Sequence, residues 1–154
     1  MRKKLKPLEY AFWLLKLRDR SVGEMQEKLG RKEFDEKEIA QTMAFLIEKD
    51  FLNDERFARN FVRFKKSLKP TGKYYLQNKL HQKKIDKDII EQALTENADD
   101  QEEVAEAANR WIAHHKNIPK EKIYEKLSRH LLSRGFEWGK VKEAVDSSLK
   151  SIPK

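Results

Sequence analysis

The residues best suited to chemistry in this chain are basic side chains gathered in one segment. Between Arg56 and Lys84, 29 residues contain ten Lys or Arg and no Asp or Glu. The next stretch, from Asp86 to Glu106, contains nine acidic residues and one lysine. In a chain of net charge +8, such segregation gives the electrostatic field a direction and attracts a polyanion to one side. We therefore expect segment 56–84 to carry a binding surface, the alternative being chance variation among the helix surfaces of a charged protein.

Side chains that could support catalysis are present, but their spacing does not suit it. His114 and His115 are adjacent, so on a helix they point about 100° apart and cannot share a metal ion as an i, i+4 pair could. The five glycines form no phosphate-binding loop, and there is no cysteine. Asp86 with Asp88 could hold magnesium, but both precede an expected helix, where acidic residues are common. We therefore expect no enzyme, no metal site and no cofactor.

The composition predicts a folded chain with thin cores. Hydrophobic residues make up 38% of the 154 residues, charged residues 39% and aromatic residues 10%, and this aromatic content argues against disorder. The longest apolar run, YAFWLL at 10–15, is far shorter than the roughly 20 residues of a membrane helix. No cleavable apolar segment follows the basic start MRKKLKP. We expect a cytoplasmic protein with no membrane contact.

Apolar residues recur with a period of about 51 residues, which indicates a repeated unit. The residues at each offset keep their class: Met25, Leu76 and Leu127; Leu29, Leu80 and Leu131; Phe34, Ile85 and Phe136; Ile39, Ile90 and Val141; Thr42, Ala93 and Ala144; Met43, Leu94 and Val145. These spacings are helical neighbours interrupted by a turn, so each unit should end in helix, turn and helix. A third helix precedes each pair.

The pattern predicts an all-α fold of nine helices, near 6–18, 21–30, 35–49, 53–68, 71–83, 86–95, 99–116, 119–133 and 137–149. Three pairs have the spacing of a capping box: Ser21 with Glu24, Asp35 with Glu38, and Asp99 with Glu102. Gly135 can adopt the left-handed conformation that ends a helix, with Phe136 as the accompanying hydrophobic contact.

These helices should form an elongated tandem array of three three-helix repeats, because units this small must share apolar surface with their neighbours. We expect the domains to be 1–52 with a basic N-terminal tail, 53–97, and 98–154 with a short C-terminal tail.

Phenylalanines and arginines alternate along the expected helix 53–68, and helical geometry separates them. Four apolar residues fall within about 60° of one another and should form the core face: Phe57, Phe61, Phe64 and Leu68. Four basic residues fall within about 80° on the opposite side: Arg56, Arg59, Arg63 and Lys66. We interpret the first set as packing and the second as a candidate binding face.

The following helix should present further candidates for binding. Leu76 and Leu80 face inward, which turns Lys73 and Lys79 to the flanks and Tyr74 outward. An exposed tyrosine among lysines could stack on a base or contact a protein, or could simply lie along the surface. The tryptophans, Trp13, Trp111 and Trp138, are expected to pack between helices.

Several segments, in order and spacing, resemble one known family over residues 9 to 149. LLKLRDRSVGEMQEKL at 14–29 resembles a segment in which Arg-x-x-Ser precedes Glu and a helix ending in Leu. FLNDERFA at 51–58 is similar to a Leu-Asp-Asp-x-Arg-Phe-Ala signature, Gly72 fits a glycine that opens the fifth helix, and LLSRGFEW at 131–138 resembles Leu-x-x-Arg-Gly-Phe. The family is RecX, the bacterial regulators of RecA.

Two departures from the family pattern affect local structure. Lys84 stands where the family usually has glycine, so the turn there must use a non-glycine residue. Asn53 replaces Asp but keeps an oxygen for capping.

The resemblance implies a noncatalytic regulator that binds RecA and its filaments on single-stranded DNA and inhibits filament extension, strand exchange and SOS coprotease activity. We expect a monomer that contacts single-stranded and also double-stranded DNA. The basic residues expected to meet acidic protein surface or phosphate, together with the exposed tyrosine, are Arg56, Arg59, Arg63, Lys66, Lys69, Lys73, Tyr74, Lys79, Lys83 and Lys84. The alternative is a stand-alone basic helical module that binds nucleic acid without a protein partner.

Overall fold

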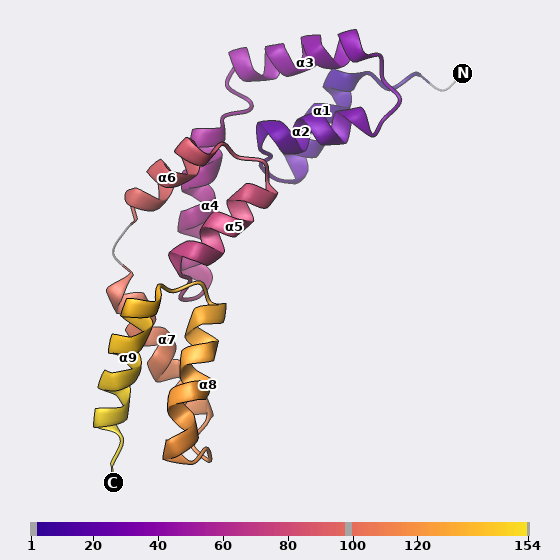
Figure 1. The fold of residues 1–154 in the computed structure, drawn as a ribbon. Coiled ribbons are helices and arrows are strands. Elements are labelled where there is room, and N and C mark those ends of the chain that lie inside the picture. The colour runs from indigo at the N-terminus through magenta and orange to yellow at the C-terminus, as the bar shows by residue number, and fades with distance from the viewer. Residues whose placement is uncertain (1–2, 98–99, 154) are drawn as a thin grey trace. The chain divides into compact units, whose positions relative to one another are not determined.

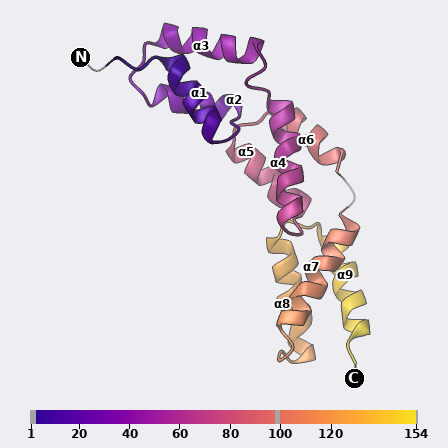
Figure 2. The same ribbon diagram turned by 180° about the vertical axis from the view of Figure 1, so that it is seen from behind.

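The computed structural model describes residues 3–97 and 100–153, and over these ranges the chain consists of nine α-helices without a strand. The helices, shown in Figures 1 and 2, are α1 (Pro7–Leu17), α2 (Val22–Gly30), α3 (Glu36–Glu48), α4 (Asp54–Leu68), α5 (Lys73–Gln82), α6 (Lys87–Thr95), α7 (Gln101–His114), α8 (Lys120–Ser133) and α9 (Trp138–Ser151). Every boundary lies within two residues of its predicted position. The all-helical fold of nine helices is therefore confirmed. None of these helices is long and apolar enough to span a membrane.

The described chain separates into two compact units. Unit 1 runs to Phe61 and also includes Leu80–Ile90, whereas unit 2 comprises Val62–Lys79 and the chain from Glu91 onward. Helices α4, α5 and α6 each contribute residues to both units. The predicted elongation and the three domain ranges stay predictions.

Helices α1, α2 and α3 of unit 1 pack on one another (Figure 1), and they enclose an apolar core. The buried side chains are Ala11, Leu14, Met25, Leu29, Ile39, Met43, Leu46 and Leu52. Helices α7, α8 and α9 of unit 2 form a second bundle, seen from behind in Figure 2, around buried residues that include Val104, Trp111, Leu127, Leu131, Phe136 and Val141. The recurring apolar positions are thus core positions, with Phe34, only partly buried, as the exception.

The apolar face of α4 differs from the prediction. Phe57 is buried and Phe61 is half-buried, but Phe64 is 58% exposed and Leu68 is 59% exposed, so the assignment of the last two to the core is wrong. Ala58 and Val62 are fully buried instead. Because each follows Phe57 or Phe61 by one residue, the buried face is rotated by roughly a quarter turn from the predicted one.

The tryptophans also divide differently from the prediction. Trp111 is buried in the core of the second bundle, as expected. Trp13 is 54% exposed and Trp138 is 50% exposed, so the prediction that both pack between helices is wrong. A tryptophan at a helical interval from core residues can lie at the edge of the packed face, where its ring covers the core on one side and meets water on the other.

Helix starts follow the capping predictions in part. Ser21 and Glu24 form the predicted capping box at α2, and Asn53 Oδ1 accepts a hydrogen bond of 2.9 Å from the Arg56 amide. Asp35 is the N-cap residue of α3 but its side chain makes no capping hydrogen bond, so the second predicted box is wrong. The third involves Asp99, which lies outside the described residues.

A close backbone approach in unit 2 fixes the start of α5 against the turn after α8. The Gly72 amide donates to the Arg134 carbonyl at 2.8 Å, and the Tyr74 amide donates to the Gly135 carbonyl at 2.9 Å. Gly135 has the predicted left-handed conformation, with φ of 85°, and Phe136 behind it is buried. A Cβ atom on Gly72 would lie 2.2 Å from the Gly135 carbonyl carbon, so only glycine fits at this position.

Replacing Gly72 by Ala should therefore destabilise the protein. We expect the free energy of unfolding, measured in urea, to fall by roughly 1–3 kcal/mol, because backbone atoms must move apart to admit the methyl group. Gly139→Ala on α9 is the matched control, since a Cβ atom there meets no atom within 4 Å. Equal urea midpoints for Gly72→Ala and the unsubstituted protein would show that the close approach is unimportant.

Candidate binding surface on the basic segment

The ten residues predicted to bind a partner divide between the two units. Arg56, Arg59, Lys83 and Lys84 belong to unit 1, and Arg63, Lys66, Lys69, Lys73, Tyr74 and Lys79 belong to unit 2. In each unit some of these side chains are engaged by the protein itself. The internal contacts decide which of them remain available to a partner.

Arg56 and Lys66 are held by their own units. The Arg56 guanidinium donates to the Asp50 carboxylate at 2.6 Å and to the Asp50 carbonyl at 2.8 Å. Lys66 is largely buried, and its Nζ donates to Glu103 Oε1 at 2.8 Å and to the Asn97 carbonyl at 3.1 Å. Hydrogen bonds from Asn53 and Arg56 hold the pKa of Asp50 below its ordinary value. Both cations therefore contribute to the fold.

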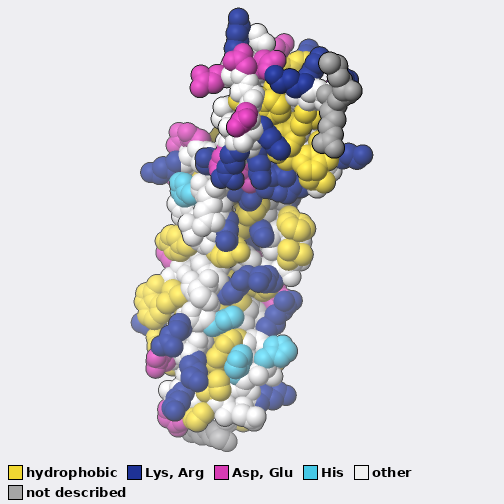
Figure 3. All heavy atoms as spheres, turned by 90° about the vertical axis from the view of Figure 1, so that its right-hand side faces the viewer, with side chains coloured by type: hydrophobic (Ala, Val, Ile, Leu, Met, Phe, Trp, Pro, Cys, Tyr) yellow, Lys and Arg dark blue, Asp and Glu magenta, His cyan; other side chains and the backbone are white. Residues whose placement is uncertain are grey.

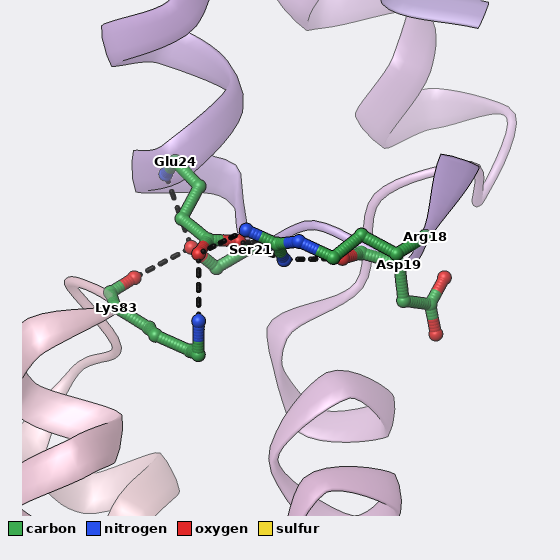
Figure 4. A network of polar contacts seen from close by, with 5 residues as sticks. All are labelled: Arg18, Asp19, Ser21, Glu24 and Lys83. Atoms are coloured by element: carbon green, nitrogen blue, oxygen red, sulfur yellow. Dashed lines mark hydrogen bonds and ion pairs between the residues drawn. The ribbon is translucent and has the colours of Figure 1, made fainter. Parts of the chain in front are cut away.

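Lys83 belongs to a polar network at the start of α2 (Figure 4). Its Nζ donates to Glu24 Oε1 at 2.9 Å, and its carbonyl accepts from the Ser21 hydroxyl at 2.5 Å. Arg18 closes the network with two hydrogen bonds of 3.0 Å to the same carboxylate. The Glu24 carboxylate thus joins a lysine distant in sequence to the loop that follows α1.

The charges around this carboxylate set its protonation. Burial acts to raise the pKa of Glu24, but hydrogen bonds from Arg18, Lys83 and the Ser21 amide lower it to about 2. Nearby, Asp54 accepts a hydrogen bond of 2.8 Å from the Val22 amide, and burial raises the pKa of Asp54. Glu24 is therefore the acid of this network that stays ionised down to low pH.

Lys84 lies next to this network and also has an internal partner. Its Nζ is 2.9 Å from Glu27 Oε2, and the pair is more exposed than Glu24 with Lys83. Hydrogen bonding from Lys84 is the main cause that lowers the pKa of Glu27. The Lys84 backbone has φ of 61°, so this turn does use a non-glycine residue in the left-handed conformation.

The other candidates are more accessible. Arg59, Arg63 and Lys69 are exposed and form no ion pair with any described residue. Lys73 is exposed beside Tyr74, with its Nζ 6.0 Å from the ring centroid, and Tyr74 is 51% exposed, as predicted. Lys79 is half-buried, with its Nζ 5.5 Å from the centroid of Tyr75. These side chains can offer positive charge to a partner without breaking an internal ion pair.

No arrangement suited to metal binding emerges from the part of the chain that the structure describes, since no three His, Asp or Glu side chains come together there. Asp86 Oδ1 accepts from the Asp88 amide at 2.9 Å, which is the capping role predicted for this pair. Asp100 is buried and pairs with Lys140 rather than capping α7. What the described residues offer is a set of cations for an anionic partner.

The sequence analysis did not predict the carboxylates that pair with some of the basic candidate residues. Glu24 and Glu103 lie far along the chain from Lys83 and Lys66, so local spacing contains no sign of either pair. The 51-residue period does relate Lys83 to Arg134, whose guanidinium donates to the Pro70 carbonyl at 2.9 Å.

Replacing Glu24 by Gln should make the free energy of unfolding less dependent on pH in the acid range. Because the folded-state pKa is depressed, the contribution of Glu24 is fully present above about pH 4.5 and is lost as pH falls through about 2. We expect a loss of about 1–2 kcal/mol at pH 7, less than the pKa shift alone implies, because Arg18 and Lys83 are partly in water. Urea unfolding at pH 7, 4 and 2.5 measures the difference.

Glu27→Gln provides the control for this change, since it removes the same charge from a more exposed position on α2. It should alter the free energy of unfolding by less than about 0.5 kcal/mol. If Glu24→Gln behaved in the same way at all three pH values, the network would have no stabilising role.

Comparison with known proteins identifies the family to which this arrangement of helices belongs. The family model for the first three-helix domain of RecX matches residues 8–46, and the model for the second three-helix domain matches residues 53–94. The first match covers α1 to most of α3, and the second covers α4 to nearly all of α6.

Individual relatives match most of the chain. Regulatory protein RecX of Prosthecochloris aestuarii is 34% identical over 149 residues, which cover 94% of each protein. Regulatory protein RecX of Vibrio parahaemolyticus is 31% identical and covers 89% of this chain and 88% of its own. The crystal structure of RecX from Lactobacillus salivarius has the same fold, with a TM-score of 0.83 at 24% identity over 95% of this chain and 96% of that one. The chain belongs to the RecX family of regulatory proteins.

Proposed function

We propose that this chain is a noncatalytic regulator that binds RecA and RecA filaments on single-stranded DNA. In this proposal it inhibits filament extension, strand exchange and SOS coprotease activity, and it acts in the cytoplasm as a monomer. The observation that carries the proposal is family membership along most of the chain, because the relatives are named regulatory proteins. The exposed cations of the basic segment give the proposal a physical basis.

Arg59 and Arg63 are the residues best placed to make the contact. Both are exposed on α4, and neither forms an ion pair within the described chain, so binding an anion costs no internal interaction. A guanidinium can donate two parallel hydrogen bonds to a carboxylate or a phosphate, which suits acidic protein surface and DNA equally. Lys69, Lys73, Tyr74 and Lys79 would extend the contact along the chain.

Arg56, Lys66, Lys83 and Lys84 have a different part in the proposal. Each is paired with an acid of its own unit. A partner's anion would compete with these carboxylates, and removing the cation would leave the carboxylate unpaired. We therefore propose that substitution of Lys66 or Lys83 acts mainly through stability, because their pairs are the more buried, whereas the exposed pairs of Arg56 and Lys84 contribute less.

The double substitution Arg59→Ala and Arg63→Ala tests the surface. Titration of RecA filaments assembled on a labelled oligonucleotide should show binding weakened at least tenfold, since each lost charge-assisted hydrogen bond contributes about 1.5–3 kcal/mol. The urea midpoint should stay unchanged, because neither side chain forms an ion pair with a described residue. Inhibition of RecA ATPase on single-stranded DNA should require correspondingly more protein.

Arg110→Ala with Arg129→Ala is the matched control. These arginines are exposed on α7 and α8 and each pairs with a glutamate one turn away, so the double variant loses the same charge elsewhere. Its binding should change less than threefold. Equal weakening in both double variants would mean that net charge, and not the α4 surface, governs the interaction.

The same cations favour a second function, that of a stand-alone nucleic-acid-binding module. In that case the chain should bind bare oligonucleotides tightly without RecA. The slope of log affinity against log salt should shrink by roughly 0.7–0.9 for each phosphate-binding arginine removed. Tight filament binding with weak, salt-sensitive binding to bare DNA would favour the regulator.

A further inference from the structure

The first three helices carry exposed aromatic rings that the basic segment does not include. Trp13 on α1 stacks on Tyr10, with ring centroids 5.8 Å apart and planes 17° apart. Tyr10 in turn contacts Phe34, whose centroid lies 6.1 Å away. Figure 3 shows hydrophobic side chains gathered beside Lys and Arg side chains in the part of the molecule that carries these helices. About half of Trp13 therefore faces water, while Tyr10 stacks against its ring and Phe34 contacts Tyr10.

A lysine lies over this aromatic stack. The Nζ of Lys32 lies 5.0 Å from the centroid of Tyr10. Glu9 lies one helical turn before Trp13, but its carboxylate pairs with Lys3 at 3.5 Å. Lys32 therefore places a positive charge beside the stack, which favours an anionic partner.

Arg20 adds a second and independent observation. Its side chain is 9% exposed, its Nε is buried without a hydrogen-bond partner, and no carboxylate of the described residues forms an ion pair with it. Burial lowers the pKa of Arg20, as does the charge of Arg18, whereas Glu24 and Tyr10 act to raise it. Glu24, the acid whose field reaches Arg20, is already bound by Arg18 and Lys83. A nearly buried guanidinium without a carboxylate is costly unless an anion joins it.

We propose that Trp13, Tyr10, Lys32 and Arg20 form a subsite for one nucleotide of single-stranded nucleic acid. A base would stack on the exposed face of Trp13, and its phosphate would lie against Lys32 and the terminal nitrogens of Arg20. Stacking accepts any base because every base has a π-face, so the subsite would be tolerant of sequence. This site is separate from Arg59 and Arg63 and needs no RecA, so it does not depend on the proposed regulatory function.

The charges favour nucleic acid over a protein segment as the occupant. A ring stack alone could equally contact an apolar side chain of a protein, since tryptophan and tyrosine are common at protein interfaces. A ligand of this site would combine a flat ring, to stack on Trp13, with an anion, to meet Lys32 beside Tyr10 and the unpaired Arg20, whose charge Tyr10 influences. A nucleotide joins a flat base to a phosphate in one unit and supplies both.

The test is a titration with a fifteen-residue oligothymidylate, followed by intrinsic tryptophan fluorescence and, with a labelled oligonucleotide, by anisotropy. Binding should quench the fluorescence of the unsubstituted protein, and Trp13→Ala should remove most of that quenching and weaken binding about 5- to 100-fold. Trp138→Ala is the matched control, because Trp138 is equally exposed but lies on α9. It should keep both the quenching and the affinity to within about twofold.

Further variants separate stacking from charge and from misfolding. Trp13→Phe keeps an aromatic ring, so its affinity should lie between those of the unsubstituted protein and Trp13→Ala. An abasic oligonucleotide of the same length should bind through its phosphates without quenching Trp13. Lys32→Ala should reduce the slope of log affinity against log salt concentration by about 0.7, which is the value for one phosphate contact on a single strand.

Several outcomes would overturn the subsite. Unchanged affinity in both Trp13 variants would do so, as would equal quenching by the abasic oligonucleotide. Loss of RecA filament binding in Trp13→Ala with normal oligothymidylate affinity would assign the surface to a protein partner instead. The regulatory proposal fails separately, because its test uses filaments and the Arg59 and Arg63 variants.

Discussion

A hydrogen bond from the start of one helix to a carbonyl 62 residues later is the contact on which both units depend. In unit 1 the Ser21 hydroxyl donates to the Lys83 carbonyl at 2.5 Å, and in unit 2 the Gly72 amide donates to the Arg134 carbonyl at 2.8 Å. The two bonds are related by the 51-residue period of the sequence. In each case the residue after the carbonyl, Lys84 or Gly135, has positive φ, which turns the chain so that the carbonyl faces its donor.

Each junction also contains a close approach that an added side chain would block. A Cβ atom on Gly23 would lie 2.5 Å from the Cβ of Lys84, and one on Gly72 would lie 2.2 Å from the Gly135 backbone. Unit 1 adds an ion pair to its hydrogen bond, through Glu24 and Lys83. Unit 2 adds a hydrogen bond from the Arg134 guanidinium to the Pro70 carbonyl. The two junctions share the hydrogen bond to the carbonyl but use different polar side chains around it. The 51-residue period is therefore clear among the apolar residues and weak among the polar ones.

The sequence predicted most of the fold because helical periodicity and the repeat both depend on residues close in the chain or at a fixed offset. It failed on α4, where Phe57 and Phe61 belong to two overlapping apolar faces, one continuing to Phe64 and the other including Val62. Only contacts from distant helices select between such faces. It failed in the same way on Lys66, since Glu103 is 37 residues away and nothing local marks the pair. The exposure of Arg59 and Arg63 could be predicted from the sequence, because it follows from helix geometry alone.

Internal acids also determine where the excess positive charge is expressed. The chain has 34 basic and 26 acidic residues, so positive charges outnumber negative charges whatever the fold. Glu24 and Glu103 each engage a cation of the basic segment, and each does so at a partly buried position where the pair resists screening by salt. The cations left to water, Arg59 and Arg63 among them, are screened and free to exchange partners. Folding thus divides the cations of one acid-free stretch into two groups. Some pair with internal acids and hold the helices together, and others can bind an anion from outside.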